Sequence, residues 1–209
     1  MNEGRPPVEN GGVLWSDGMD LLKDAAERKH FLPTGLEGID TLLGGGLRKG
    51  QLTEITGQSS SGKTQACLYS ASHVAARHMG AVLYLDTSNS FSPSRIARIL
   101  DELPGSLIKE PKDVRLKRVM SSIIWRSMMI SVAMILKKLA DKHNLSVLVT
   151  NHMVAGNGAP KPALGESWKA VPHIRLMISR DRGSNICTAT ILKHTLLASG
   201  RHMKFAVPG

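Results

Sequence analysis

The feature that most constrains this sequence is a short loop pattern placed between a strand-like segment and a helix-like segment. Residues 57–64 read GQSSSGKT and match G-x-x-x-x-G-K-[ST]. The preceding QLTEIT, residues 51–56, alternates as a strand does. Residues 64–78 are mostly small or apolar and free of Pro and Gly, which favours a helix packed on a sheet. A strand, a phosphate-binding loop and a helix in this order predict a nucleotide-binding α/β fold.

The residue types of this loop fit the chemistry of phosphate binding. Gly57 and Gly62 permit backbone angles that turn successive N–H groups towards phosphates, and the helix N-terminus adds a positive partial charge. We expect Lys63 to reach the β- and γ-phosphates of ATP and Thr64 to offer its hydroxyl to Mg²⁺. The alternative is a Ser/Gly loop without a chemical role. The expected ATP-binding residues are Gly57, Gln58, Ser59, Ser60, Ser61, Gly62, Lys63 and Thr64.

Strand and helix patterns alternate along the rest of the chain. The apolar run AVLYLD, residues 81–86, predicts a parallel strand buried on both faces. The other expected strands are residues 119–125, 145–151, 174–179 and 187–192, and the other expected helices are 13–29, 39–43, 93–103 and 126–143. The predicted class is therefore α/β, with a largely parallel sheet flanked by helices.

Composition excludes several classes of protein. The chain has 209 residues, 42% hydrophobic and 21% charged, which is typical of a globular protein rather than a disordered one. Its two cysteines are 120 positions apart, fit no metal-ligand spacing and are expected to be reduced. The longest apolar stretch, about residues 128–136, is too short to cross a bilayer, so no membrane partner is expected. No secretory signal begins the chain, which favours an intracellular location.

The positive charge is concentrated in the second half of the chain. The 27 basic residues exceed the 17 acidic ones and give a net charge of +10; residues 109–209 alone hold 17 basic and 5 acidic side chains. Clustered Lys and Arg contact phosphates, so DNA is an expected partner, and Lys161, Lys169 and Arg175 are the candidate contacts. A solvated basic face is the alternative. Trp168 either stacks on a base or anchors its loop, and anchoring is favoured.

Two polar residues follow predicted strands. Asp86 ends AVLYLD, where it either caps the strand or takes part in the site. Asn151 ends LSVLVTN, beside His152, and is a candidate γ-phosphate sensor at the carboxyl edge of the sheet, although both residues can simply begin a loop.

Several of these runs, in the same order, resemble the RecA-like recombinases of eukaryotes. They are PTGLEGIDTLLGGGLRKGQLTEITG, GQSSSGKTQ, VLYLDTSNSFSPSRI, LVTNH and KPALGESWKAVPHIRLMISRD, within residues 30–197. More narrowly, the chain resembles the plant delta-type paralogues, which act in homologous-recombination repair. The resemblance implies a RecA-like ATPase core over residues 30–209, after a disordered tail and linker helix at residues 1–29. It also implies a nuclear protein that binds ATP, Mg²⁺ and DNA and assembles with sister paralogues, and it places the DNA-facing loop at about residues 153–168.

The chain departs from this family at three places. Active members carry a glutamate that polarises water where this chain has Ser88, so the resemblance implies weak ATP hydrolysis. No apolar run ending in Asp lies between residues 87 and 145. The resemblance implies that about fifty residues of the family, including its central magnesium-organising strand, have no counterpart near 125–126, which would leave an unpaired sheet edge. After Leu197 the sequence does not continue as the family's final strands would.

The departures leave two functions open. The first is an ATP-binding paralogue that assists assembly of a strand-exchange filament on DNA. The second is a non-catalytic module that binds partners or DNA from a shortened, ATPase-deficient chain. An unrelated P-loop kinase or transporter ATPase is a weaker alternative.

Overall fold

The computed structural model describes residues 30–77, 79–103, 116–120, 129–154, 161–181 and 183–207. The expected tail and linker helix at residues 1–29 and the junction at 125–126 lie outside these ranges. The helical elements are α2 (Glu37–Leu43), α3 (Lys63–Ala76), α4 (Pro93–Glu102), α5 (Met129–His143) and the 3-10 turn η3 (Ser167–Ala170). The strands are β1 (Phe31–Leu32), β2 (Leu47–Arg48), β3 (Leu52–Gly57), β4 (Val82–Asp86), β5 (Leu116–Met120), β6 (Val147–Val154), β7 (Lys161–Pro162), β8 (Ile174–Arg180), β9 (Ile186–Lys193) and β10 (His202–Ala206).

The main sheet has six strands in the order β10-β9-β8-β3-β6-β7. Its centre is parallel, because β3 pairs in parallel with both β6 and β8. Its margins are antiparallel, through β8 with β9, β9 with β10, and β6 with β7. The sheet is therefore mixed, and the predicted parallel character holds for the strands that carry the nucleotide loop.

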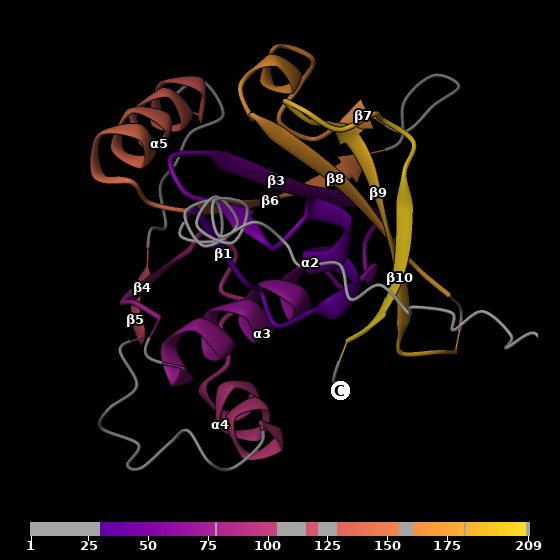
Figure 1. Ribbon diagram of the computed structural model, residues 1–209. Helices are drawn as coiled ribbons and strands as arrows, with labels where there is room; N and C mark the ends of the chain where they lie inside the picture. Colours follow the sequence, from indigo (N-terminus) through magenta and orange to yellow (C-terminus); the bar gives the residue numbers. More distant parts are fainter. Residues whose placement is uncertain are drawn as a thin grey trace, which may run out of the picture.

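Helices cover both faces of this sheet, with α5 on one side of β3 and β6 and α2 and α3 on the other (Figure 1). The larger core cluster lies on the α2 and α3 face and includes Leu42, Ile55, Ala66 and Ile191. A smaller cluster on the α5 face joins Ala133, Trp168 and Val171. Successive residues of a strand point to opposite faces, so the sequence of β3 assigns Ile55 to the first face and Glu54 to the second.

Strands β4 and β5 form a separate parallel pair, drawn at the left of Figure 1. Tyr84 packs against a cluster of Leu68, Ile96 and Ile99, but Leu83 and Leu85, on the opposite face, are 60% and 47% exposed. The prediction that this strand is buried on both faces is therefore wrong. Among the described residues no helix covers the second face, and none of the described strands lies between β4 and β6.

Two further elements differ from expectation. The strand expected at residues 119–125 begins earlier, since β5 covers Leu116–Met120, and residues 121–125 lie outside the described ranges. The C-terminal sequence, expected to depart from the fold, forms β10, which pairs with β9 from His202↔Thr190 to Ala206↔Ile186. Phe205 and Val207 are buried there in the larger core cluster. Within the described part of the chain, every helix is too short or too polar to span a membrane.

Candidate nucleotide-binding site

The predicted phosphate-binding loop joins the end of β3 to the start of α3. Gly57 ends β3 so close to the carbonyl oxygen of Ile178 that a Cβ atom at this position would collide with it. Gly62 caps α3 with φ of 94°, a left-handed conformation that side chains disfavour, and no side chain caps the helix. Both glycines of the pattern are therefore required by the backbone, and the loop leads directly into the N-terminus of a 14-residue helix, whose positive partial charge favours an anion.

Lys63 holds the inside of the loop together. Its Nζ donates hydrogen bonds to the carbonyl oxygens of Gly57 at 2.9 Å and Gln58 at 2.6 Å, and to Ser61 Oγ at 3.3 Å. Burial lowers the pKa of the Lys63 ammonium. These three acceptors are neutral oxygens, so they solvate the ammonium without neutralising its charge. The donor set fits the phosphates of ATP, and Thr64, the next residue on the first turn of α3, fits the coordination of a phosphate-bound Mg²⁺.

Cys187 packs against the nucleotide loop, a contact that the sequence did not predict. The buried thiol of Cys187 on β9 donates to the carbonyl oxygen of Ser61 at 3.7 Å, and its sulfur would lie 3.1 Å from a Cβ atom at Gly62. Burial raises the pKa of this thiol. It therefore remains protonated at neutral pH and acts as a small apolar support.

A buried carboxylate connects β3 to three other segments. Glu54 is fully buried and accepts hydrogen bonds from the side chains of Asn151 at 2.8 Å, Trp168 at 2.7 Å and Arg175 at 2.5 Å. Sequence analysis missed this residue, although a carboxylate inside the apolar strand QLTEIT was a signal, because a buried carboxylate needs a cation or several donors. The network fixes the end of β6 and the turn that contains Trp168 to the strand preceding the nucleotide loop.

This network changes the interpretation of Asn151. The register pairs Thr56 with Asn151 and Gly57 with His152. Paired residues of neighbouring strands share a face, so Asn151 points to the α5 face with Glu54, and its Oδ1 has no hydrogen-bond partner among the described residues. The geometry does not favour Asn151 as the γ-phosphate sensor, because the nucleotide loop leads into α3 on the opposite face. The exposed His152 lies on that face.

The three candidate DNA contacts have different surroundings. Arg175 is 6% exposed and is paired with Glu54, so the prediction that it contacts DNA is wrong; a buried, paired guanidinium cannot reach a phosphate without breaking the network. Lys161 and Lys169 are exposed, and Lys169 Nζ lies 2.7 Å from Glu166 in a surface ion pair. Trp168 is buried with its indole bonded to Glu54, which agrees with the anchoring role.

Asp86 organises the turn after β4. Its buried carboxylate accepts backbone N–H bonds from Ser88 and Ser90 at 3.3 and 3.1 Å through Oδ1, and from Phe91 at 3.1 Å through Oδ2. These bonds give Asp86 the capping role that the sequence left open. Ser88, which stands where active members of the resembled family carry a glutamate, is exposed and bonds to Ser90.

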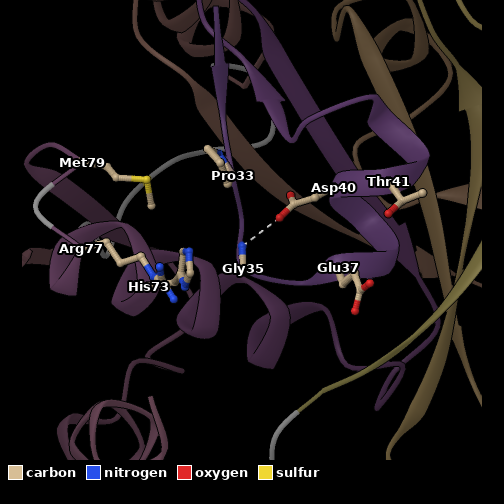
Figure 2. A pocket seen from close by; sticks show the side chains of 8 residues that line it. All are labelled: Pro33, Gly35, Glu37, Asp40, Thr41, His73, Arg77 and Met79. Carbon is tan, nitrogen blue, oxygen red and sulfur yellow. Dashed lines mark hydrogen bonds between the residues drawn. The ribbon is translucent and has the colours of Figure 1, made fainter. Parts of the chain in front are cut away.

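A cavity lies at the opposite end of α3 from the nucleotide loop (Figure 2). It has a volume of about 390 Å³ and is lined by residues of the segment before α2, of α2 itself and of the end of α3, including Glu37, Asp40, His73 and Arg77. Asp40 is bonded to Thr34 and Gly35. The ring of His73 packs directly on Gly35, where a Cβ atom would lie 2.5 Å from Cγ and Nδ1. This cavity is therefore separate from the phosphate-binding loop.

Comparison with known proteins agrees with this architecture. The Rad51 family model matches residues 27–107. The bovine DNA repair protein RAD51 homolog 4 is 31% identical, over 80% of this chain and 67% of its own length. The chain belongs to the Rad51 and RecA-like recombinase family. The archaeal DNA repair and recombination protein RadB of Archaeoglobus fulgidus is 26% identical over 83% of this chain and 94% of its own.

The fold agrees as well. The crystal structure of the RadB recombinase superimposes with a TM-score of 0.63 at 23% identity and covers 85% of this chain and 96% of that one. The expected RecA-like α/β fold is therefore confirmed, with helices on both faces of a mixed central sheet. The curated relatives are DNA repair and recombination proteins by name.

The bovine alignment contains positions to which this chain contributes no residue. It runs over 218 positions but uses only 80% of 209 residues, which is about 167 residues. About 51 aligned positions of the relative, the difference between 218 and 167, therefore have no counterpart here.

Proposed function

We propose that this chain is an ATP-binding recombinase paralogue of the delta type that acts in homologous-recombination repair in the nucleus. In this proposal it assembles with sister paralogues and assists the formation of a strand-exchange filament on DNA. The observation that carries the proposal is the phosphate-binding loop, in which Gly57 and Gly62 shape the backbone and the Lys63 ammonium donates to three neutral oxygens. The family membership of the chain supports the partners and the pathway.

ATP, when bound with Mg²⁺, would supply a charged γ-phosphate whose presence can be sensed by the protein. The residues of this chain would bind it as follows: the loop N–H groups and Lys63 hold the phosphates, Thr64 coordinates Mg²⁺, and His152 lies on the same face of the sheet. Ser88 cannot act as a general base near neutral pH, so we propose that ATP regulates assembly and is turned over slowly. Exposed Lys161 and Lys169 are the proposed DNA contacts.

Equilibrium binding of a fluorescent ATP analogue with Mg²⁺ tests the proposal. The unmodified chain should bind it saturably, and Lys63→Ala should weaken binding by about tenfold or more, because it removes a charge-assisted contact worth about 1.5–3 kcal/mol. Lys138→Ala is the matched control, since Lys138 is an exposed lysine of α5 on the opposite face of the sheet. Equal binding by Lys63→Ala and the parent would refute the assignment of the loop.

A further inference from the structure

The segment that joins β4 to α4 contains a sequence pattern that the nucleotide site does not use. It reads Ser92-Pro93-Ser94-Arg95, a serine followed directly by proline, with an arginine at the third position after the serine. Of the ten prolines of the chain, only Pro93 follows a serine or threonine. One class of protein kinases selects this order of residues, because a pocket for proline adjoins the acceptor serine and acidic groups bind the basic side chain further along.

The hydroxyl of Ser92 lies at the surface of the molecule. Ser92 is half-buried, and Pro93, Ser94 and Arg95 are exposed. The partners of Ser92 Oγ are Ser94 Oγ at 2.9 Å and the Arg95 N–H at 3.4 Å, and both bonds are exposed to solvent. The hydroxyl can therefore leave these partners without leaving a buried donor or acceptor unsatisfied.

Only the first turn of α4 must open before a kinase can bind this segment in an extended form. Ser92 already has extended backbone angles, φ −129° and ψ 112°, and Pro93 is the first residue of the helix. The first buried side chain of α4 is Ile96, which follows the pattern. Opening as far as Arg95 therefore leaves the packing of Ile96 and Ile99 in place, and the ends of helices open at a low cost in free energy.

The surroundings of Ser92 can accommodate a phosphate once it is attached. The Arg95 side chain is exposed and forms no ion pair within the described part of the chain. Helix α4 has ten residues and no acidic side chain in its first turn, so no carboxylate there competes for Arg95 or repels an anion. A phosphate carries about −1.5 to −2 charges at neutral pH and three acceptor oxygens. The N–H and the guanidinium of Arg95 are its nearest donors in the sequence.

We propose that Ser92 is a phosphorylation site for a proline-directed protein kinase that also requires a basic residue at the third position after the serine. The Ser92 hydroxyl oxygen bonds to the γ-phosphorus of ATP, the bond from this phosphorus to the β–γ bridging oxygen breaks, and ADP leaves with that electron pair. The hydroxyl proton passes to a carboxylate of the kinase. The phosphate then pairs with Arg95. The kinase binds the ATP that is consumed, so the proposal does not depend on the phosphate-binding loop of this chain.

Phosphorylation of the full, folded chain in vitro tests this proposal. The probe is a cyclin-dependent kinase with ATP and Mg²⁺, and mass spectrometry of the intact chain and of its fragments counts and locates the phosphates. We expect a single phosphate, on Ser92. Arg95→Gln should slow its incorporation by about tenfold, because the kinase loses a charge-assisted contact with its substrate. Ser94→Ala, the matched change at the neighbouring serine, should leave the rate unchanged.

Two substitutions of Ser92 separate the acceptor hydroxyl from the cap of α4. Ser92→Asp keeps a good helix cap but offers no hydroxyl, so it should incorporate no phosphate. Ser92→Thr keeps both the cap and a hydroxyl and should incorporate one. Thermal melting followed by circular dichroism checks that both variants fold as the parent does. In the phosphorylated parent, hydrogen exchange at the Arg95 amide should be slower than in the unmodified chain.

Four results would overturn the proposal. The acceptor is wrong if the phosphate lies on another residue or if Ser92→Asp is labelled as fully as the parent. The kinase class is wrong if Arg95→Gln is labelled as fast as the parent. Access is wrong if the folded chain takes up no phosphate, whether or not a synthetic peptide of residues 87–99 is labelled by the same kinase. An unchanged exchange rate at the Arg95 amide after phosphorylation would overturn the pairing of the phosphate with Arg95.

Discussion

The two sides of the central strand β3 differ in how completely they are packed. On the β8 and β9 side, strands are paired on both edges and residues such as Leu176, Ile178 and Ile191 are essentially inaccessible to solvent. On the β6 side, positions 147–152 pair with a described strand on one edge only, and Leu83 and Leu85 of β4 and Leu139 of α5 are exposed. The sequence patterns on the two sides are equally apolar. The difference shows that burial of an apolar strand depends on its neighbours rather than on its own sequence.

The geometry of the nucleotide loop depends on contacts with β8 and β9, the side of β3 on which strands are paired on both edges. The carbonyl of Ile178 on β8 packs against Gly57, and Cys187 on β9 supports Ser61. Glu54 joins β3 to β8 through Arg175. The loop can therefore keep its geometry although the β6 edge is open, and perturbations on the complete side should have the larger effects.

The largest expected effect comes from the buried Glu54. Glu54→Ala leaves the Arg175 guanidinium buried without its partner and removes the acceptor of Asn151 and Trp168. We expect the free energy of unfolding to fall by about 3–5 kcal/mol, measured by urea denaturation. Glu166→Ala, which breaks the surface pair with Lys169, is the control and should leave the midpoint unchanged. A similar small effect for both variants would contradict the buried network.

A leucine truncation on each side compares the packing directly. Leu176→Ala, which truncates a fully buried side chain of β8, should cost about 2–5 kcal/mol, because it leaves a cavity in a well-packed core. Leu85→Ala, in exposed β4, should change stability by about 0.5 kcal/mol or less. Equal losses in urea denaturation would mean that both sides are packed alike and would remove the basis of the comparison.

A smaller effect concerns pH. Burial lowers the pKa values of His73, His173 and His194, and the nearby Arg77 also lowers the pKa of His73. In the unfolded chain the three histidines bind protons near their ordinary pKa of about 6.5, whereas in the folded chain they bind protons only at lower pH. The contribution of these histidines to the free energy of unfolding should therefore be complete above about pH 7.5 and should fall as the pH drops through about 6.5.

Urea denaturation at several pH values measures this fall. Arg77→Gln should make the loss shallower, because the His73 pKa then lies closer to its ordinary value. Stability that rises on acidification through this range would show that these imidazoles gain rather than lose protonation on folding.

Much of the nucleotide site could be predicted from the sequence, because a phosphate-binding loop is local: eight consecutive residues and the strand and helix around them determine its geometry. Residue roles that depend on contacts with distant parts of the chain could not be predicted from the sequence. Arginine is a residue type that commonly contacts DNA phosphates. Only the pairing of Arg175 with Glu54, 121 positions away in the sequence, shows that its guanidinium is buried. The orientation of Asn151 follows from strand register, which the sequence of β6 alone does not determine. Strand β10 has the weak pattern of an edge strand and is stabilised by its pairing with β9.

Hydrogen exchange with and without ATP and Mg²⁺ tests the central claim most directly, that a complete half of the sheet carries a working nucleotide loop beside an incomplete half. We predict slow exchange in β3, β8 and β9, faster exchange in β4 and β5, and additional protection on addition of ATP and Mg²⁺ at the junction of β3 and α3, from Gly57 to Thr64. Uniformly fast exchange across β3, β8 and β9, or no added protection at this junction, would contradict the claim.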